Sequence, residues 1–597
     1  MQTTTTLLSI IRTRGKRGLP LQNVYRMLYN PNLYLTAYGK LYRNHGAMTR
    51  GTTPETVDGM SLAKIDHIID LLRTERYRWT PVRRVYIPKA NGKRRPLGLP
   101  SWSDKLLQEV IRLILEAYYE PQFDHRSHGF RPGRGCHTAL AEVQRIWTGT
   151  RWFIEGDIAQ YYDTIDHTLL LDVLLERIHD NRFLELVRRL LQAGYMEDWR
   201  YHKTLSGAPQ GGVVSPILAN LYLHAFDQYV TRTLIPQYTR GDQRKVNSAH
   251  QRICNRLCYI RGKPGRAAEA KSLIKARRRL PSKDPNDPDY RRLWYVRYAD
   301  DMLLGYIGTR QEAEDIKAKL ADWLARERQL TLSPDKTLIT HATSTPARFL
   351  GYDIINQQSH TKCTAGARSV NGRIALRVPA DVIAKKCQPY LRQGKPIHRS
   401  ERIFNTDFSI MADYQQQYRG IVQYYQLAIN VCHLGKLRWV MEQSLLKTLA
   451  AKHRTRVGAM AAKYKATVVG PDGRSRQCLA VVMTRDGKSD RVARFGGIPL
   501  QRQRAAVLND QPLEARACYT ELEKRVRADM CEVCGSTTQV EVHHIRKLRD
   551  GPHSDGRTIP AWKRQMIARQ RKTLVLCRVC HVKLHSGLFD DNLGLRR

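Results

Sequence analysis

The sequence lacks any run of about twenty apolar residues, so we expect no membrane-spanning helix. It also lacks a secretory core and cleavage site at its start, where a Thr-rich, acid-free stretch favours a flexible arm over an organelle transit peptide. Acidic residues are scarce: 55 Asp and Glu stand against 100 Lys and Arg, for a formal net charge of +45. Because solubility needs far less charge, this surplus predicts a polyanionic partner whose binding weakens steeply with salt.

The 12 cysteines follow no disulfide pattern. Most are scattered, and the rest form two Cys-x-x-Cys pairs near the C-terminus. This usage suits a reducing compartment and a bound metal. At 597 residues the chain is too long for one core, and its length predicts about three to five domains.

Two adjacent carboxylates, Asp300 and Asp301, lie between short apolar runs in residues 295–307, YVRYADDMLLGYI. The pattern predicts a hairpin with the carboxylates at its tip. A turn alone would more often use Asn-Gly or Asp-Gly, so the pair favours a divalent cation held by oxygen ligands over a solvated acidic turn. A third carboxylate, Asp157, ends the apolar run WFIEGD. Three carboxylates from two strands could share two Mg2+ ions for in-line nucleotidyl transfer.

Tyr298-Ala299-Asp300-Asp301, taken with Asp157, resembles the polymerase site of reverse transcriptases. The similarity extends along almost the whole chain to the group II intron-encoded proteins, which combine reverse transcriptase, RNA-splicing maturase and HNH endonuclease segments. The resemblance implies a multidomain α+β fold with right-hand fingers and palm, an α-helical thumb and a small zinc-braced ββα-metal HNH domain. The divisions we expect are an N-terminal extension (1–75), fingers and palm (76–365) with a polar, irregular basic insertion (about 238–293), a thumb or maturase domain (366–465), a DNA-binding segment (466–525) and an HNH domain (526–597).

The same resemblance assigns substrate contacts to five side chains. It implies that Lys89 and Arg95 clamp the nucleotide triphosphate, and that Lys336 acts as general acid toward the departing pyrophosphate. Tyr162 matches the aromatic residue under the sugar, where a ring would collide with a 2'-hydroxyl, and Gln210 matches a residue near the nucleotide. Without the motifs around them, the basic side chains would be interpreted as ordinary solvated ones.

Residues 370–465 carry long helical patterns rich in Tyr, Arg, Lys and His, which suit a helical region that grips a nucleic-acid backbone. Within it, SLLKTLAAKH (444–453) resembles the maturase signature of the family. From spacing alone, a plain helical bundle explains the pattern equally well.

The two Cys-x-x-Cys pairs, Cys531/Cys534 and Cys577/Cys580, predict a tetrahedral Zn2+ site that folds a segment too small for its own core. Histidines occur between and after the pairs, in EVHHI and CHVKLH. By resemblance to HNH nucleases, His544 is the base that activates water, and the ligands of the catalytic ion, expected to be Mg2+, are His543, His581 and His585. A purely structural zinc ribbon would leave these histidines unexplained. Where the motif usually has Asn, the chain has Lys572 or Thr573.

The resemblance therefore implies an RNA-directed DNA polymerase, maturase and DNA endonuclease that acts in intron splicing and target-primed retrohoming. Its expected partners are intron RNA in a ribonucleoprotein, target DNA and dNTPs, with a homodimer left open, in the bacterial cytoplasm or alternatively an organelle. One rival is an RNA-binding splicing factor with vestigial catalytic modules, which the intact carboxylates oppose. Another is a stand-alone defence-associated reverse transcriptase, which SLLKTLAAKH and the HNH segment oppose.

Overall fold

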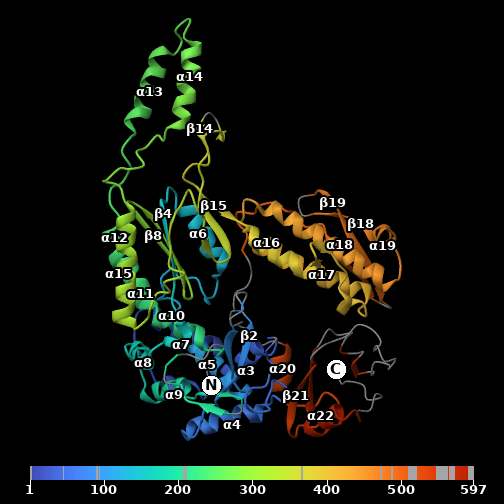
Figure 1. Ribbon diagram of the computed structural model, residues 1–597. Helices are drawn as coiled ribbons and strands as arrows, with labels where there is room; N and C mark the ends of the chain where they lie inside the picture. The colour runs from blue at the N-terminus through green and yellow to red at the C-terminus, as the bar shows by residue number, and fades with distance from the viewer. Residues whose placement is uncertain are drawn as a thin grey trace.

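The computed structural model describes most of the chain. The described residues are 3–44, 46–88, 92, 94–198, 200–204, 206–207, 211–364, 367–470, 473–485, 488–507, 521–545, 562–563, 566 and 572–588. Helices and several small sheets alternate along the chain and pack around two large hydrophobic cores and a small C-terminal one (Figure 1). The fold is multidomain α+β, as the sequence predicts. Within the described residues no helix is long and apolar enough to cross a membrane.

Helices dominate the N-terminal part. Its elements are α1 (Thr4–Lys16), β1 (Leu21–Gln22), α2 (Val24–Met27), α3 (Pro31–Leu41), α4 (Leu62–Arg73) and α5 (Trp102–Tyr119). Apolar residues cover one whole side of α5, and α1 and α3 pack against it. At Gly15 of α1 a Cβ atom would lie 2.0 Å from the Tyr118 carbonyl oxygen, so the absence of a side chain lets the two helices meet.

A four-stranded sheet follows in the order β3-β2-β6-β7. Its strands are β2 (Val82–Pro88), β3 (Arg94–Leu99), β6 (Tyr195–Glu197) and β7 (Arg200–His202). The elements just before β6 in the chain are α8 (His167–Leu175), β5 (Ile178–His179) and α9 (Asn181–Leu191). Strand β5 pairs with β1, and α8 packs against α9.

The central sheet is antiparallel, in the order β10-β4-β9-β8. Its strands are β4 (Trp152–Asp157), β8 (Arg292–Tyr298), β9 (Asp301–Ile307) and β10 (Ile339–His341). Side chains alternate between its faces: Met302 and Leu304 join the core that holds α15, whereas Leu303 joins the core that holds α6. Burial on both faces explains why the strands lack a polar alternation, and the predicted hairpin at 295–307 is confirmed.

Helices enclose this sheet on both faces (Figure 1). They are α6 (Cys136–Ile146), α7 (Tyr161–Thr164), α10 (Ser215–Tyr222), α11 (His224–Tyr229), the π-helix η1 (Val230–Leu234), α12 (Ile235–Gln237) and α15 (Arg310–Arg328). Helix α15 begins with a capping box in which the Thr309 hydroxyl accepts from the Glu312 N–H and the Glu312 carboxylate accepts from the Thr309 N–H.

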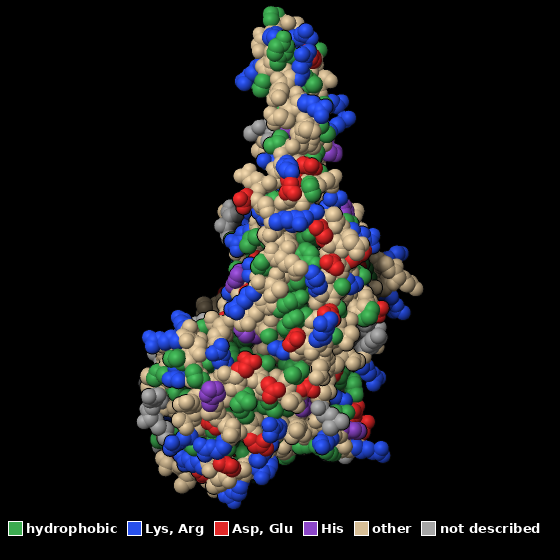
Figure 2. All heavy atoms as spheres, turned by 90° about the vertical axis from the view of Figure 1, so that its left-hand side faces the viewer, with side chains coloured by type: hydrophobic (Ala, Val, Ile, Leu, Met, Phe, Trp, Pro, Cys, Tyr) green, Lys and Arg blue, Asp and Glu red, His purple; other side chains and the backbone are tan. Residues whose placement is uncertain are grey.

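The basic insertion is helical in its middle, where the sequence analysis expects irregular chain. It forms α13 (Ser248–Ile260) and α14 (Ala267–Arg279), which lie side by side and project from the body of the protein (Figure 1). Lys and Arg side chains line the projection (Figure 2). The helices bury almost nothing, so an amphipathic pattern facing a core could not reveal them.

A second helical region is interleaved with three small sheets. The strands are β11 (Ala347–Phe349), β12 (Tyr352–Asn356), β13 (Cys363–Thr364), β14 (Ala367–Arg368), β15 (Ile374–Arg377), β16 (Leu391–Arg392) and β17 (Lys395–Pro396). The helices are α16 (Ala380–Cys387), η2 (Gln388–Tyr390), η3 (Ser400–Arg402), α17 (Asp407–Tyr424), η4 (Val431–Leu434), α18 (Gly435–Lys452) and α19 (Val457–Tyr464). Helix α17 packs on an antiparallel sheet of β18 (Lys465–Val469), β19 (Ser475–Arg485) and β20 (Lys488–Gly496).

The C-terminal module lies against the N-terminal helices, as α20, β21 and α3 show in Figure 1. It consists of α20 (Glu521–Arg527), β21 (Val540–His544), β22 (Thr573–Cys577) and α22 (Arg578–His585). Strands β21 and β22 pair antiparallel, and Val540 and Val542 enter the same core as the N-terminal helices. The two ends of the chain therefore share one hydrophobic core.

Candidate active sites

Three acidic residues meet at one edge of the central sheet. The strand register places Asp157 of β4 opposite Asp301 of β9, and Asp300 occupies the turn before β9. Ala299 in that turn has φ of +56°, a left-handed conformation that costs free energy for a residue with a side chain. A Cβ atom on Gly129 would lie 2.3 Å from the Ala299 nitrogen, so this glycine lets the neighbouring loop approach the turn.

A fully buried ion pair between Arg297 and Asp227 contacts this turn. Arg297 at the end of β8 donates from Nε and Nη2 to the two carboxylate oxygens of Asp227, at 2.8 and 2.6 Å. Its remaining N–H groups donate to the Ala299 carbonyl (2.7 Å), the Asn220 side chain (3.2 Å) and the Ser127 hydroxyl (2.9 Å). The sequence analysis missed this network, because a buried Arg cannot be told from a surface Arg by composition.

The three carboxylates lie close enough to repel one another. Loss of solvent, together with the charges of Asp300 and Asp157, raises the pKa of Asp301 to about 7. Burial likewise raises the pKa of Asp300. The ammonium of Lys336 lies 2.6 Å from Asp157 Oδ2, and that hydrogen bond raises the pKa of Lys336. Such a group of carboxylates favours binding of cations.

Five residues are expected to contact the substrate, and the structure describes the positions of three of them. Tyr162 lies on α7, where burial and the charge of Asp300 raise its pKa against the opposing charge of Arg95. Arg95 is exposed on β3, and Lys336 contacts Asp157 as described. Lys89 and Gln210 lie outside the described residues.

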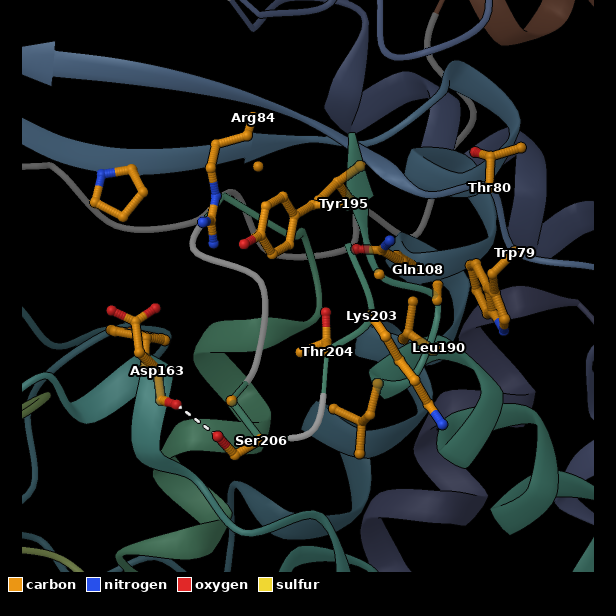
Figure 3. A pocket seen from close by; sticks show the side chains of 18 residues that line it. Trp79, Thr80, Arg84, Gln108, Asp163, Leu190, Tyr195, Lys203, Thr204 and Ser206 are labelled. Atoms are coloured by element: carbon orange, nitrogen blue, oxygen red, sulfur yellow. Dashed lines mark hydrogen bonds between the residues drawn. The ribbon is translucent and has the colours of Figure 1, made fainter. Parts of the chain in front are cut away.

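A cavity of about 350 Å³ lies beside Tyr162, between the β3-β2-β6-β7 sheet and the adjoining helices (Figure 3). Arg84 stacks over the ring of Tyr195, with its guanidinium carbon 3.4 Å from the ring centroid. On the opposite wall the Ser206 hydroxyl donates to the Asp163 carbonyl. The cavity therefore extends the Tyr162 side of the site with both apolar and polar surface.

Four cysteines meet in the C-terminal module: Cys531, Cys534, Cys577 and Cys580. The Cys534 and Cys577 sulfurs are 3.6 Å apart, close to the spacing of about 3.8 Å that tetrahedral Zn–S bonds of about 2.3 Å require. A backbone hydrogen bond from Ser536 lowers the pKa of Cys534 to about 7, which favours the thiolate that a metal binds. These residues fit Zn2+, as the sequence predicts.

Three histidines of β21 and α22 form a second group in the C-terminal module. His543 Nδ1 lies 3.1 Å from His581 Nε2, which lies 3.0 Å from His585 Nε2. Glu541 holds the other nitrogen of His581 at 2.8 Å, which orients that ring. Although burial opposes it, the hydrogen bonds of Asp58 and Glu541 raise the pKa of His581 to about 9. The sequence analysis missed Asp58, which joins this group.

His544, the expected base, contacts the N-terminal helices. Its Nε2 lies 2.8 Å from the Tyr38 hydroxyl of α3, and burial lowers the pKa of His544 to about 3. The ring is therefore neutral at physiological pH, but a pKa this low makes it a weak proton acceptor. Opposite it in the β21–β22 register lies Thr573, whose hydroxyl accepts from Arg525 at 2.9 Å.

Three family models match the chain in succession. They are a reverse transcriptase (RNA-dependent DNA polymerase) at residues 87–260, a type II intron maturase at 371–470 and an AI2M/AI1M-like HNH endonuclease at 531–581. The chain is therefore an enzyme that joins an RNA-directed DNA polymerase to maturase and DNA endonuclease domains. Both catalytic domains imply the use of divalent metal ions and nucleic-acid substrates.

Whole-length relatives narrow this class. The chain is 38% identical over 582 residues to "Group II intron-encoded protein LtrA" of Lactococcus lactis subsp. cremoris, covering 94% of each chain. It is 34% identical to the "Uncharacterized 91 kDa protein in cob intron" of Schizosaccharomyces pombe and 31% identical to the "Putative COX1/OXI3 intron 1 protein" of Saccharomyces cerevisiae, covering 96% of this chain and 70% of each relative. The chain belongs to the group II intron-encoded proteins, which confirms the resemblance seen in the sequence.

Removing the buried partner of Arg297 should destabilise the protein. We expect Asp227→Ala to lower the free energy of unfolding by about 3–5 kcal/mol, because it leaves an uncompensated buried charge. The matched control is Asp322→Ala, which removes an exposed partner of Arg326 and should cost no more than about 1 kcal/mol. Urea unfolding followed by tryptophan fluorescence measures both, and equal losses would contradict the structural role of the pair.

The raised pKa of Asp301 predicts a pH-dependent need for metal. A cation that binds Asp301 below pH 7 would have to displace its proton, and in that case the Mg2+ concentration for half-maximal primer extension should rise by up to about tenfold per pH unit. Because the charge of Lys336 lowers this pKa, Lys336→Gln should move the rise to higher pH. A titration of Mg2+ between pH 6 and 8 tests this, and a requirement that stays constant over this range would contradict it.

Proposed function

We propose that the chain copies RNA into DNA at Asp157, Asp300 and Asp301, which would hold two Mg2+ ions. The observation that carries this proposal is the strand register that pairs Asp157 with Asp301 next to the turn bearing Asp300. When bound, the ions would lower the pKa of a primer 3'-hydroxyl and steady the leaving pyrophosphate. The high pKa of Asp301 supports the proposal, since a cation relieves the repulsion that causes it.

The side chains expected to contact the substrate would select and position the nucleotide. The Tyr162 ring would exclude a 2'-hydroxyl, and the charges of Arg95 and Lys89 would offset the triphosphate of an incoming dNTP. Lys336 would donate a proton to the departing pyrophosphate; its position against Asp157 supports this role. Gln210 would contact the nucleotide.

We further propose a right-hand architecture for the polymerase. The central sheet would be its palm, the β3-β2-β6-β7 sheet would belong to its fingers, and α16 to α19 would form its thumb. The proposed divisions are an N-terminal extension (1–75), fingers and palm (76–365) with the basic insertion (about 238–293), the thumb or maturase domain (366–465), a DNA-binding segment (466–525) and the HNH domain (526–597).

Intron RNA would bind as the partner of a ribonucleoprotein. The net charge of +45 and the projecting helices α13 and α14, which carry one acidic residue among many basic ones, support a large polyanion. Ser444 and Thr448 of the signature helix α18 are buried and hydrogen-bonded to Tyr414. The buried part of that signature would therefore shape the helical domain, leaving RNA contacts to its exposed basic residues.

The C-terminal module would cut DNA. Zn2+ on the four cysteines would fold the module, and a second divalent ion, Mg2+ in the simplest case, would bind His543, His581 and His585 next to the base His544. The ββα order of β21, β22 and α22 supports an HNH nuclease. In a retrohoming cycle the RNA would insert into one DNA strand, this module would nick the other, and the polymerase would extend the new 3' end.

The protein would work in the bacterial cytoplasm, with an organelle as the alternative compartment. A homodimer would be compatible with the proposed cycle.

Asp300→Asn should lower dNTP incorporation on a primed RNA template by at least about a hundredfold, because it removes a charge that binds metal. Binding of the same RNA should stay unchanged, and the control Asp322→Asn should affect neither. Extension retained by Asp300→Asn would contradict the metal assignment. Absence of extension in the wild-type chain, with tight binding of structured RNA, would favour a splicing factor with vestigial catalytic modules.

His544→Ala should abolish nicking of target DNA while primer extension persists, because it removes the base of the nuclease alone. Nicking of a labelled duplex by the ribonucleoprotein measures the first activity, with His433→Ala as an exposed control. Zinc content should stay that of the wild type. Loss of zinc or of both activities would indicate a folding role for His544 instead.

A further inference from the structure

A loop of the N-terminal extension extends the sheet of the HNH module. The Gly59 N–H donates to the Val542 carbonyl at 3.0 Å, and the Val542 N–H donates to the Met60 carbonyl at 2.8 Å. Met60 and Val542 thereby form an antiparallel bridge along β21. Gly59 has φ of +79°, a conformation that strains other residues. These backbone bonds fix residues 58–60 next to the histidines.

An apolar interface holds this arrangement in place. Val542 and Val575 of the module, Val526 of α20, and Tyr34 and Tyr38 of α3 belong to one buried core. A contact of this kind keeps its geometry, because the apolar surfaces would otherwise be exposed to water. The shared core therefore holds the loop against the module.

The carboxylate of Asp58 lies among the three imidazoles. Its Oδ1 is 3.4 Å from His543 Nδ1 and 3.5 Å from His581 Nε2, and its Oδ2 is 3.0 Å from His585 Nε2. The His544 N–H donates to Oδ1 at 2.8 Å, which fixes the carboxylate. A divalent ion with bonds of about 2.0–2.2 Å places neighbouring ligand atoms about 3.0–3.5 Å apart. The four side chains have the spacing of a metal site.

We propose that Asp58 is the fourth protein ligand of the nuclease ion, so that the site is shared between the N-terminal extension and the HNH module. The inference rests on the proposed nuclease function. Three imidazoles with one carboxylate suit a first-row transition ion such as Zn2+ or Mn2+ better than Mg2+. When bound, such an ion would activate a water molecule and polarise a DNA phosphate.

The surroundings of the site suit such a substrate. Asp58, His543 and His585 line a cavity of about 570 Å³ together with Arg50 and Lys563. The two basic residues come from the extension and from the module, and both offer positive charge to a phosphodiester. The cavity is therefore formed by both parts of the chain.

The test counts metal ions on the full-length protein after exposure to excess Zn2+ and desalting. The wild type should retain two ions per chain, and Asp58→Asn one. Asn keeps an oxygen that accepts the His544 N–H, so this variant preserves the loop. Asp58→Ala should also retain one ion, and the exposed control Asp66→Ala two. The affinity of the second ion should fall at least about a hundredfold in Asp58→Asn.

Measuring the rate of DNA nicking in the same variants distinguishes the proposed role of Asp58 as a metal ligand from the proposed nuclease function of the module. Slower nicking by Asp58→Asn, with one ion lost, supports a shared site. Two retained ions in both variants would overturn the proposal even if His544→Ala abolishes nicking. If Asp58→Asn loses one ion but His544→Ala does not change nicking, Asp58 would still be a metal ligand and the proposed nuclease role of the module would be overturned. Faster nicking by Asp58→Asn would also overturn the shared site, because Asp58 would then block the ion.

Discussion

The buried pair of Arg297 and Asp227 is the constraint on which the polymerase site depends. All five N–H donors of the guanidinium have partners, and these come from α10, α11, the loop at Ser127 and the carboxylate-bearing turn. Desolvating both charges is costly unless every such bond is made. The pair therefore forms only when these segments are assembled, and it then holds Asp300 and the strained Ala299 in one conformation.

The two catalytic regions differ in how their charges are arranged. At the central sheet, like charges are held together by the surrounding fold, and Lys336 partly offsets them. In the C-terminal module, imidazoles surround the carboxylates of Asp58 and Glu541, so that opposite charges attract when His581 is protonated. The carboxylates at the central sheet need a cation to relieve their repulsion. In the C-terminal module a protonated imidazole already offsets the carboxylate charge without a metal ion. Protons therefore compete with metal in both, through carboxylates in the first and imidazoles in the second.

Local patterns predicted the local features. The apolar runs around Asp300 and Asp301 gave the hairpin, and the spacing of the cysteines gave a four-sulfur group, because both depend on residues near in sequence or on a fixed motif. The sequence analysis did not predict helices α13 and α14, because they lack a buried face. It did not identify Asp58, because the partners of Asp58 lie nearly the whole chain away in sequence. It did not identify the role of Arg297, because burial is a property of the tertiary structure.

The core shared by the N-terminal helices and the C-terminal module can be completed only after the module has been synthesised. Roughly 500 residues separate α3 from β21, and at about 5–20 residues per second a ribosome needs about 25–100 s to make them. During that interval the N-terminal helices keep an uncovered apolar surface. The entropy of closing so long a loop grows only slowly with its length, so the delay affects kinetics more than stability. The nascent polymerase therefore exists before the surface that receives its nuclease is covered, and during that time chaperones and RNA can reach it.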